Sequence, residues 1–165
     1  MKNNIFPIFN MKLTNNRWFV EGIWIVSSFA FAFIILLPIQ IYNIKFPFIT
    51  TNIAFIVGFS LFCRWIFLWK FTPYAWSKIL KLVLIFIFIP LTFVGINKFY
   101  DFRIYLDEIG LQELVPHLGV SEQTSMILYM RNEMIFFGTS FIITASIIPF
   151  IMIWSIWKQY NRNEV

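Results

Sequence analysis

Apolar residues occur in four long stretches along the chain, and each stretch contains few charged residues. The stretches cover about 22–42, 48–69, 79–96 and 134–157. Each is close to the roughly 20 apolar residues that a helix needs to cross about 30 Å of hydrocarbon. Alternation of period two is absent, and only helices satisfy every backbone group within one segment in lipid. The pattern predicts an all-α integral membrane protein, a four-transmembrane-helix bundle in a single domain over residues 1–165.

The composition supports this interpretation. Hydrophobic residues make up 59% of the chain and charged residues only 13%, whereas about a quarter of a typical soluble domain is charged. A chain of 165 residues is too short to hide so much apolar surface in a soluble core. The abundance of Ile and Phe beside few Ala and Gly is typical of an AT-rich coding genome, so we expect a bacterial protein.

The basic residues predict the orientation. Nine of the thirteen flank the same ends of the four stretches: Lys2, Lys12, Arg17, Arg64, Lys70, Lys78, Lys81, Lys158 and Arg162. All seven tryptophans fall at those ends as well: Trp18, Trp24, Trp65, Trp69, Trp76, Trp154 and Trp157. Basic residues favour the cytosolic side, and tryptophan favours the headgroup region. We therefore expect a multi-pass protein of the bacterial cytoplasmic (inner) membrane with both termini in the cytosol.

The connection between the third and fourth stretches, about 97–133, holds six of the eight acidic residues. Its pattern predicts a helical extracytoplasmic hairpin that breaks at Gly110, with Ser121 as the N-cap of the last helix. Three leucines in the hairpin exceed what a solvated loop needs: Leu111, Leu114 and Leu118. They are candidates for docking a periplasmic protein; alternatively, they pack against each other and the bilayer surface.

The last stretch contains a run of small and hydroxylated residues: Gly138, Thr139, Ser140, Thr144, Ala145 and Ser146. Such residues let membrane helices approach closely and exchange hydrogen bonds. They predict a helix-packing face, either within the bundle or against another subunit. Prolines inside three stretches, Pro38, Pro90 and Pro149, predict structural kinks; alternatively, they mark breaks that line a transport path.

Arg64 lies well inside the second stretch and needs a partner or a route to the surface. The candidate partner is Glu21, which precedes the first stretch at the same predicted membrane face. A charge within a membrane span marks a functional site by default. The alternative is that Arg64 extends to the lipid headgroups.

The scarce residues limit the chemistry. With one cysteine, Cys63, and one histidine, His117, the chain alone cannot form a disulfide, a cysteine zinc site or bis-histidine haem ligation. Asp101 and Glu108 share a helical face, but we interpret them as part of a solvated surface. The sequence thus predicts no catalytic residues, no metal site and no cofactor.

These observations favour a non-catalytic accessory or scaffold subunit of a larger inner-membrane complex. Its expected partners are other integral membrane subunits, the lipid bilayer and a periplasmic protein, with no nucleic acid. One alternative is a small transporter or channel component that works as an oligomer. A second is a subunit of a membrane redox or quinone-linked enzyme, which His117 and Cys63 support only weakly.

Overall fold

The structure is a computed structural model that describes residues 7–72, 75 and 77–161. Its elements are α1 (Pro7–Ile41), α2 (Ile49–Phe67), α3 (Lys78–Glu108) and α4 (Val120–Asn161), with short 3-10 helices η1 (Trp69–Phe71) and η3 (Gln112–Leu114). The described part of the chain is all-helical, as predicted. The four α-helices are long and apolar enough to cross a membrane, which confirms the number of candidate spans.

Three helices extend beyond the predicted apolar stretches. α1, α3 and α4 contain 35, 31 and 42 residues. α3 ends at Glu108, and Gly110 follows with a φ of 78°, so the predicted break is present. The prediction of Ser121 as N-cap is wrong, because the amide of Gln123 already bonds to the carbonyl of Gly119 and closes the first turn earlier.

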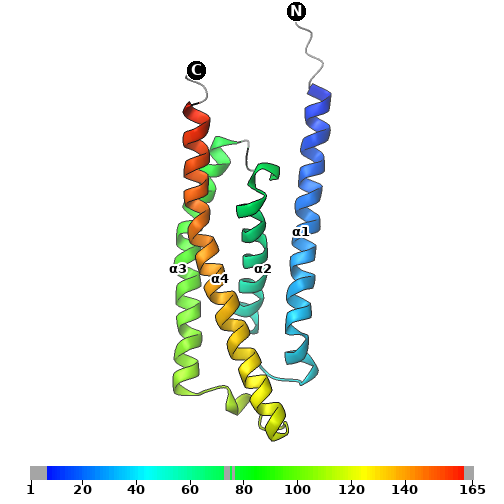
Figure 1. Ribbon diagram of the computed structural model, residues 1–165, viewed down its shortest axis with the longest axis vertical. Helices are drawn as coiled ribbons and strands as arrows, with labels where there is room; N and C mark the ends of the chain where they lie inside the picture. Colours follow the sequence, from blue (N-terminus) through cyan, green and yellow to red (C-terminus); the bar gives the residue numbers. More distant parts are fainter. Residues whose placement is uncertain (1–6, 73–74, 76, 162–165) are drawn as a thin grey trace, which may run out of the picture.

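Both ends of the described chain lie at one end of the bundle, together with the α2–α3 connection (Figure 1). We call this the termini end. The α1–α2 and α3–α4 connections lie at the opposite end, which we call the far end. The described tryptophans belong to helix segments toward the termini end, whereas Lys2, Trp76 and Arg162 lie outside the described residues.

α2 and α4 form the centre of the bundle, with α1 against α2 and α3 against α4 (Figure 1). α1 buries one narrow stripe among its described side chains: Glu21, Ser28, Ala32, Leu36 and Ile39. α3 likewise buries one residue in every seven: Lys81, Phe88, Gly95 and Phe102. Because 3.5 residues make one turn of a supercoiled helix, this spacing gives α3 a single seam against its neighbours.

The core is built from aromatic rings that lie against glycines. The ring of Phe141 on α4 occupies the space beside Gly58 of α2 and Gly95 of α3. In the opposite direction, the ring of Phe99 on α3 lies against Gly138 of α4, where an added Cβ would come within 2.5 Å of it. Each glycine thus lets a neighbouring helix approach closely enough to bury a phenylalanine.

Candidate functional site

A buried ion pair joins α1 to α2 toward the termini end. The guanidinium Nη1 of Arg64 donates to Oε2 of Glu21, and both residues are about 95% buried. The ring of Trp24 lies 5.5 Å from the guanidinium carbon and adds a cation–π contact. The structure therefore brings together the two residues that the sequence paired, and Arg64 does not extend to the surface. Further along the same seam, the hydroxyls of Ser28 and Ser60 lie 3.0 Å apart.

A second buried polar pair joins α2 to α4 toward the far end. Asn52 Nδ2 donates to Oε2 of Glu133 at 2.5 Å. Asn52 is fully buried, and only 7% of Glu133 is exposed. The other two oxygens of the pair, Glu133 Oε1 and Asn52 Oδ1, are buried without a hydrogen-bond partner. Sequence analysis placed Glu133 among the solvated acids of the connection, and that placement is wrong.

The signal for this pair was present in the sequence. Glu133 lies in register with the buried methionines of α4, Met126, Met130 and Met134, so it falls on the helix stripe that faces the core. Asn52 carries the only side-chain amide of the second apolar stretch, and an amide within a span needs a hydrogen-bond partner as much as a charge does.

The two pairs are placed symmetrically on α2. Asn52 lies three residues after the first residue of α2, and Arg64 lies three residues before the last. At 1.5 Å per residue, they are separated by about 18 Å along the helix. α2 is therefore tied by a buried carboxylate at each end, to α1 at one and to α4 at the other.

Lys81 in the first turn of α3 is also buried, and it is one of the nine basic residues by which the sequence predicted the cytosolic face. Its Nζ donates to the hydroxyl of Ser155 on α4 at 2.9 Å. The indole N–H of Trp69 donates to the same hydroxyl at 3.4 Å. Lys81 is the first member of the α3 seam, which explains why a basic residue near a helix end faces inward.

The predicted small-residue face is used mainly within the bundle. Gly138, Thr144 and Ala145 are buried against this chain's own helices. Thr139, Ser140 and Ser146 are half-buried, and the hydroxyls of Thr139 and Ser146 bond to carbonyls of α4 itself. These contacts support the interpretation of a packing face within the bundle. Gly138, Thr144 and Ala145 are covered by this chain's own helices, so they are not free to contact another subunit.

The predicted docking leucines are also drawn inward. Leu111 belongs to the buried core, while Leu114 and Leu118 are half-buried and pack against it. They hold the α3–α4 connection onto the helices. This agrees with the alternative interpretation, in which the three leucines pack against each other instead of docking a partner. His117 supports the same arrangement, because its Nε2 donates to the carbonyl of Tyr42 at 2.9 Å and so links the two far-end connections.

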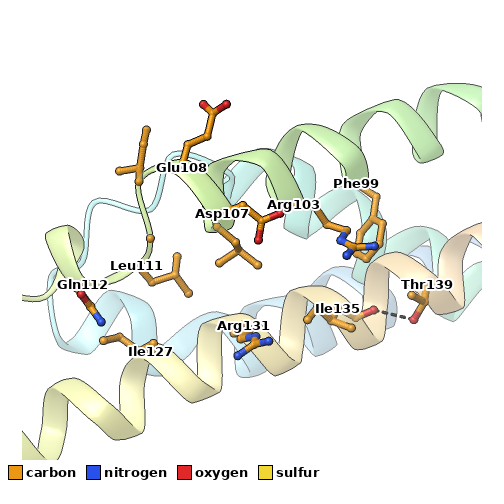
Figure 2. Close-up of a pocket in the computed structure, with 13 residues that line it drawn as sticks. Phe99, Arg103, Asp107, Glu108, Leu111, Gln112, Ile127, Arg131, Ile135 and Thr139 are labelled. Carbon is orange, nitrogen blue, oxygen red and sulfur yellow. Dashed lines mark hydrogen bonds between the residues drawn. The ribbon is translucent and has the colours of Figure 1, made fainter.

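A hollow lies between α3 and α4 toward the far end, and we call it the α3–α4 groove (Figure 2). It has a volume of about 670 Å³. Apolar side chains form much of its lining: Phe99, Leu106, Ile109, Leu111, Ile127 and Ile135. Polar side chains complete it: Arg103, Asp107, Glu108, Gln112, Arg131 and Thr139.

Two arginines line this groove. Arg103 belongs to α3 and lies beside Phe99, and Arg131 belongs to α4 (Figure 2). Within the described residues, the ion pairs closer than 4 Å are Arg64 with Glu21 and Lys98 with Asp101, so neither groove arginine has an acidic partner. Asp107 shares the groove, whereas Glu108 points away from α4 (Figure 2). The lining thus carries two exposed arginines and two acidic residues, and no arginine–carboxylate ion pair forms among them.

The remaining candidates take part in ordinary contacts. Asp101 pairs with Lys98 at 3.1 Å on the surface, so its carboxylate is not aimed at Glu108. Cys63 is a half-buried free thiol on α2. Pro38, Pro90 and Pro149 lie inside α1, α3 and α4, each of which continues as a helix beyond its proline. No group of three or more His, Cys, Asp or Glu forms a metal site in the described part of the chain.

Neither a protein-family model, nor a curated protein, nor a solved structure matches this chain. Function must therefore be argued from the two buried carboxylates and the α3–α4 groove.

Proposed function

We propose that this chain is a non-catalytic accessory subunit of a bacterial inner-membrane complex, with both termini in the cytosol. In this topology the α3–α4 groove opens on the extracytoplasmic side, where it receives an acidic segment of a partner subunit. The single observation that carries the proposal is that two arginines, neither of which forms an ion pair within the described residues, line one groove together with apolar side chains.

The chemistry of the groove fits such a segment. Guanidinium groups bind carboxylates through paired N–H donors, and the groove is lined by one arginine from each of its two helices. The apolar lining accommodates the hydrophobic side chains that flank an acidic residue. Binding interfaces typically combine an apolar centre with arginine anchors. The docking surface thus moves from the three leucines, which hold the fold together, to the groove beside them.

Neutralising both arginines should release the partner. We expect Arg103→Gln with Arg131→Gln to lower recovery of co-purifying membrane chains at least about tenfold, because each charge-assisted bond contributes about 1.5–3 kcal/mol. The measurement is quantitative mass spectrometry after mild-detergent purification from cells at native expression. Lys98→Gln is the matched control, since Lys98 is exposed and already paired with Asp101 outside the groove.

Unchanged recovery in the double variant would show that the groove is not the docking surface. A wild-type chain that purifies alone under these conditions would argue against a stable complex altogether.

The proposed topology gives a labelling prediction. In a Cys63→Ser background, a cysteine replacing exposed Gln112 should react with a membrane-impermeant maleimide added to intact cells, whereas one replacing exposed Lys78 should not. These positions lie at the far end and the termini end of the bundle, respectively. Labelling at 78 but not at 112 would reverse the orientation, and lysed cells, in which both should react, provide the control.

A small transporter remains the second candidate, and the buried Glu133 favours it. This carboxyl borders a hollow of about 400 Å³ lined by α1 and α4 residues, among them Ile35, Tyr129 and Asn132. An ionisable residue inside a span often marks an ion path. Proteoliposomes that contain only this chain and move a solute in proportion to a pH gradient would favour the transporter over the accessory subunit.

A further inference from the structure

We propose that Glu133 and Asn52 form a proton-binding site in which Glu133 is held as the neutral carboxylic acid in a cyclic pair with the Asn52 amide. Three observations support it. The two side chains are buried next to each other, one hydrogen bond joins them, and each has one oxygen without a hydrogen-bond partner. This inference is independent of the α3–α4 groove.

The two unpartnered atoms are complementary only if a proton is present. With an ionised carboxylate, Glu133 Oε1 and Asn52 Oδ1 are both acceptors and are left buried without a donor. A proton on Oε1 makes it a donor that can bond to Oδ1, while Oε2 accepts from Nδ2 as observed. Binding one proton converts the carboxylate to the acid, breaks no bond and satisfies every polar atom of the pair. Leaving such atoms unpaired costs about 1–3 kcal/mol each.

No other charge takes the place of the proton. The ion pairs within the described residues use Arg64 and Lys98, so no basic group pairs with Glu133. Tyr129, one turn away on α4, donates its hydroxyl to the carbonyl of Ile35 on α1 at 2.5 Å. Arg131 on α4 and Arg103 on α3 line the α3–α4 groove, and α2 presents the neutral Asn52.

A metal ion fits the site less well than a proton. Ca²⁺ and Mg²⁺ take about six oxygen ligands or more, whereas the pair offers two free oxygens. The hollow beside Glu133 is also bordered by Asn132, which is exposed.

The test uses the purified full-length chain and four variants. Infrared spectroscopy at about pH 7 should show the C=O band of a protonated carboxyl, a form that an ordinary glutamic acid has lost at that pH. Glu133→Gln should remove the band, and Glu122→Gln, which changes an exposed acid on the same helix, should keep it. Asn52→Leu should shift the band to higher frequency, because the acid loses its hydrogen-bond partner. Absence of a band that depends on Glu133 would overturn the proposal.

Thermal unfolding provides a second readout. A group that holds its proton in the folded state stabilises the fold at low pH, and this contribution is lost as the pH rises and the proton leaves. We expect the wild-type Tm to fall by about 5 °C between about pH 6 and about pH 9. Glu133→Gln should be stable and largely flat across this range, because its amide reproduces both bonds. Glu133→Ala should have a lower Tm than the wild type at every pH. A steep fall of the Tm with pH that persists in Glu133→Gln would contradict the protonated pair. Strong destabilisation of Glu133→Gln near pH 6 would contradict it as well.

Discussion

Replacing Arg64 by methionine should destabilise the protein by about 3 kcal/mol, which corresponds to a Tm lower by about 6–12 °C. The reason is that Glu21 would remain buried without its cationic partner, and Trp24 would lose the guanidinium that its ring contacts. Glu21→Gln should cost a similar amount, because it leaves the arginine uncompensated. The measurement is thermal unfolding of the purified chain in mild detergent, followed by circular dichroism.

The double variant tests the coupling. Glu21→Gln with Arg64→Met should cost about 2 kcal/mol less than the sum of the two single changes. Each single change leaves one buried charge without its partner, whereas the double change leaves no buried charge at all. The surface pair Lys98–Asp101 is the matched control, and its own cycle should be additive within about 0.5 kcal/mol. Additive effects at Glu21 and Arg64 would show that the buried ion pair contributes no coupling energy.

Gly138→Leu should unfold or strongly loosen the bundle, at a cost of about 3 kcal/mol or more. A Cβ at this position would lie 2.5 Å from the Phe99 ring and 3.2 Å from the Phe55 ring, so α3 and α2 would both have to move away from α4. Limited proteolysis and thermal unfolding report this loss. The effect should appear in the isolated chain, without any partner.

Gly22→Leu is the matched control for this change. Gly22 is exposed on α1, and no heavy atom lies within 4 Å of the Cβ that would be added. The same substitution there should change the stability by less than about 0.5 kcal/mol. If Gly138→Leu were as well tolerated as Gly22→Leu, the close approach of Phe99 to α4 would not be a requirement of the fold.

The helices could be predicted from the sequence because their apolar stretches are long and uninterrupted. The pairing of Glu21 with Arg64 could be predicted as well, since each is the natural partner of the other at one predicted membrane face. The sequence also predicted that the third helix continues to a break at Gly110 and that the fourth begins near Ser121, close to the observed bounds of α3 and α4. The start of α1 at Pro7 was not predicted, because the residues before the first apolar stretch are largely polar.

The functional use of residues was harder to predict than the helices. Gly138 and Ala145 were interpreted as a possible partner face, because a linear sequence does not show that Phe99 of another helix needs the space. Glu133 was grouped with the acids of the solvated connection, because it lies at the edge of an apolar stretch where charge is usually exposed. The burial of Lys81 was not predicted for the same reason. The α3–α4 groove depends on Arg103 and Arg131, which are distant in sequence and meet only when the two helices pack.

The two polar residues in the buried stripe of α1, Glu21 and Ser28, have a consequence for the order of events during synthesis. Glu21 leaves the ribosome 43 residues before Arg64, so α1 carries an uncompensated acid until the last turn of α2 has been made. From that moment the two N-terminal helices hold their own charge balance, together with the Ser28–Ser60 contact, and need nothing from the second half of the chain for it. α2 then still has Asn52 near its other end, which waits for Glu133. Chain order therefore makes the Glu21–Arg64 pair available before the Asn52–Glu133 pair, so the bond between α1 and α2 does not depend on the synthesis of α4.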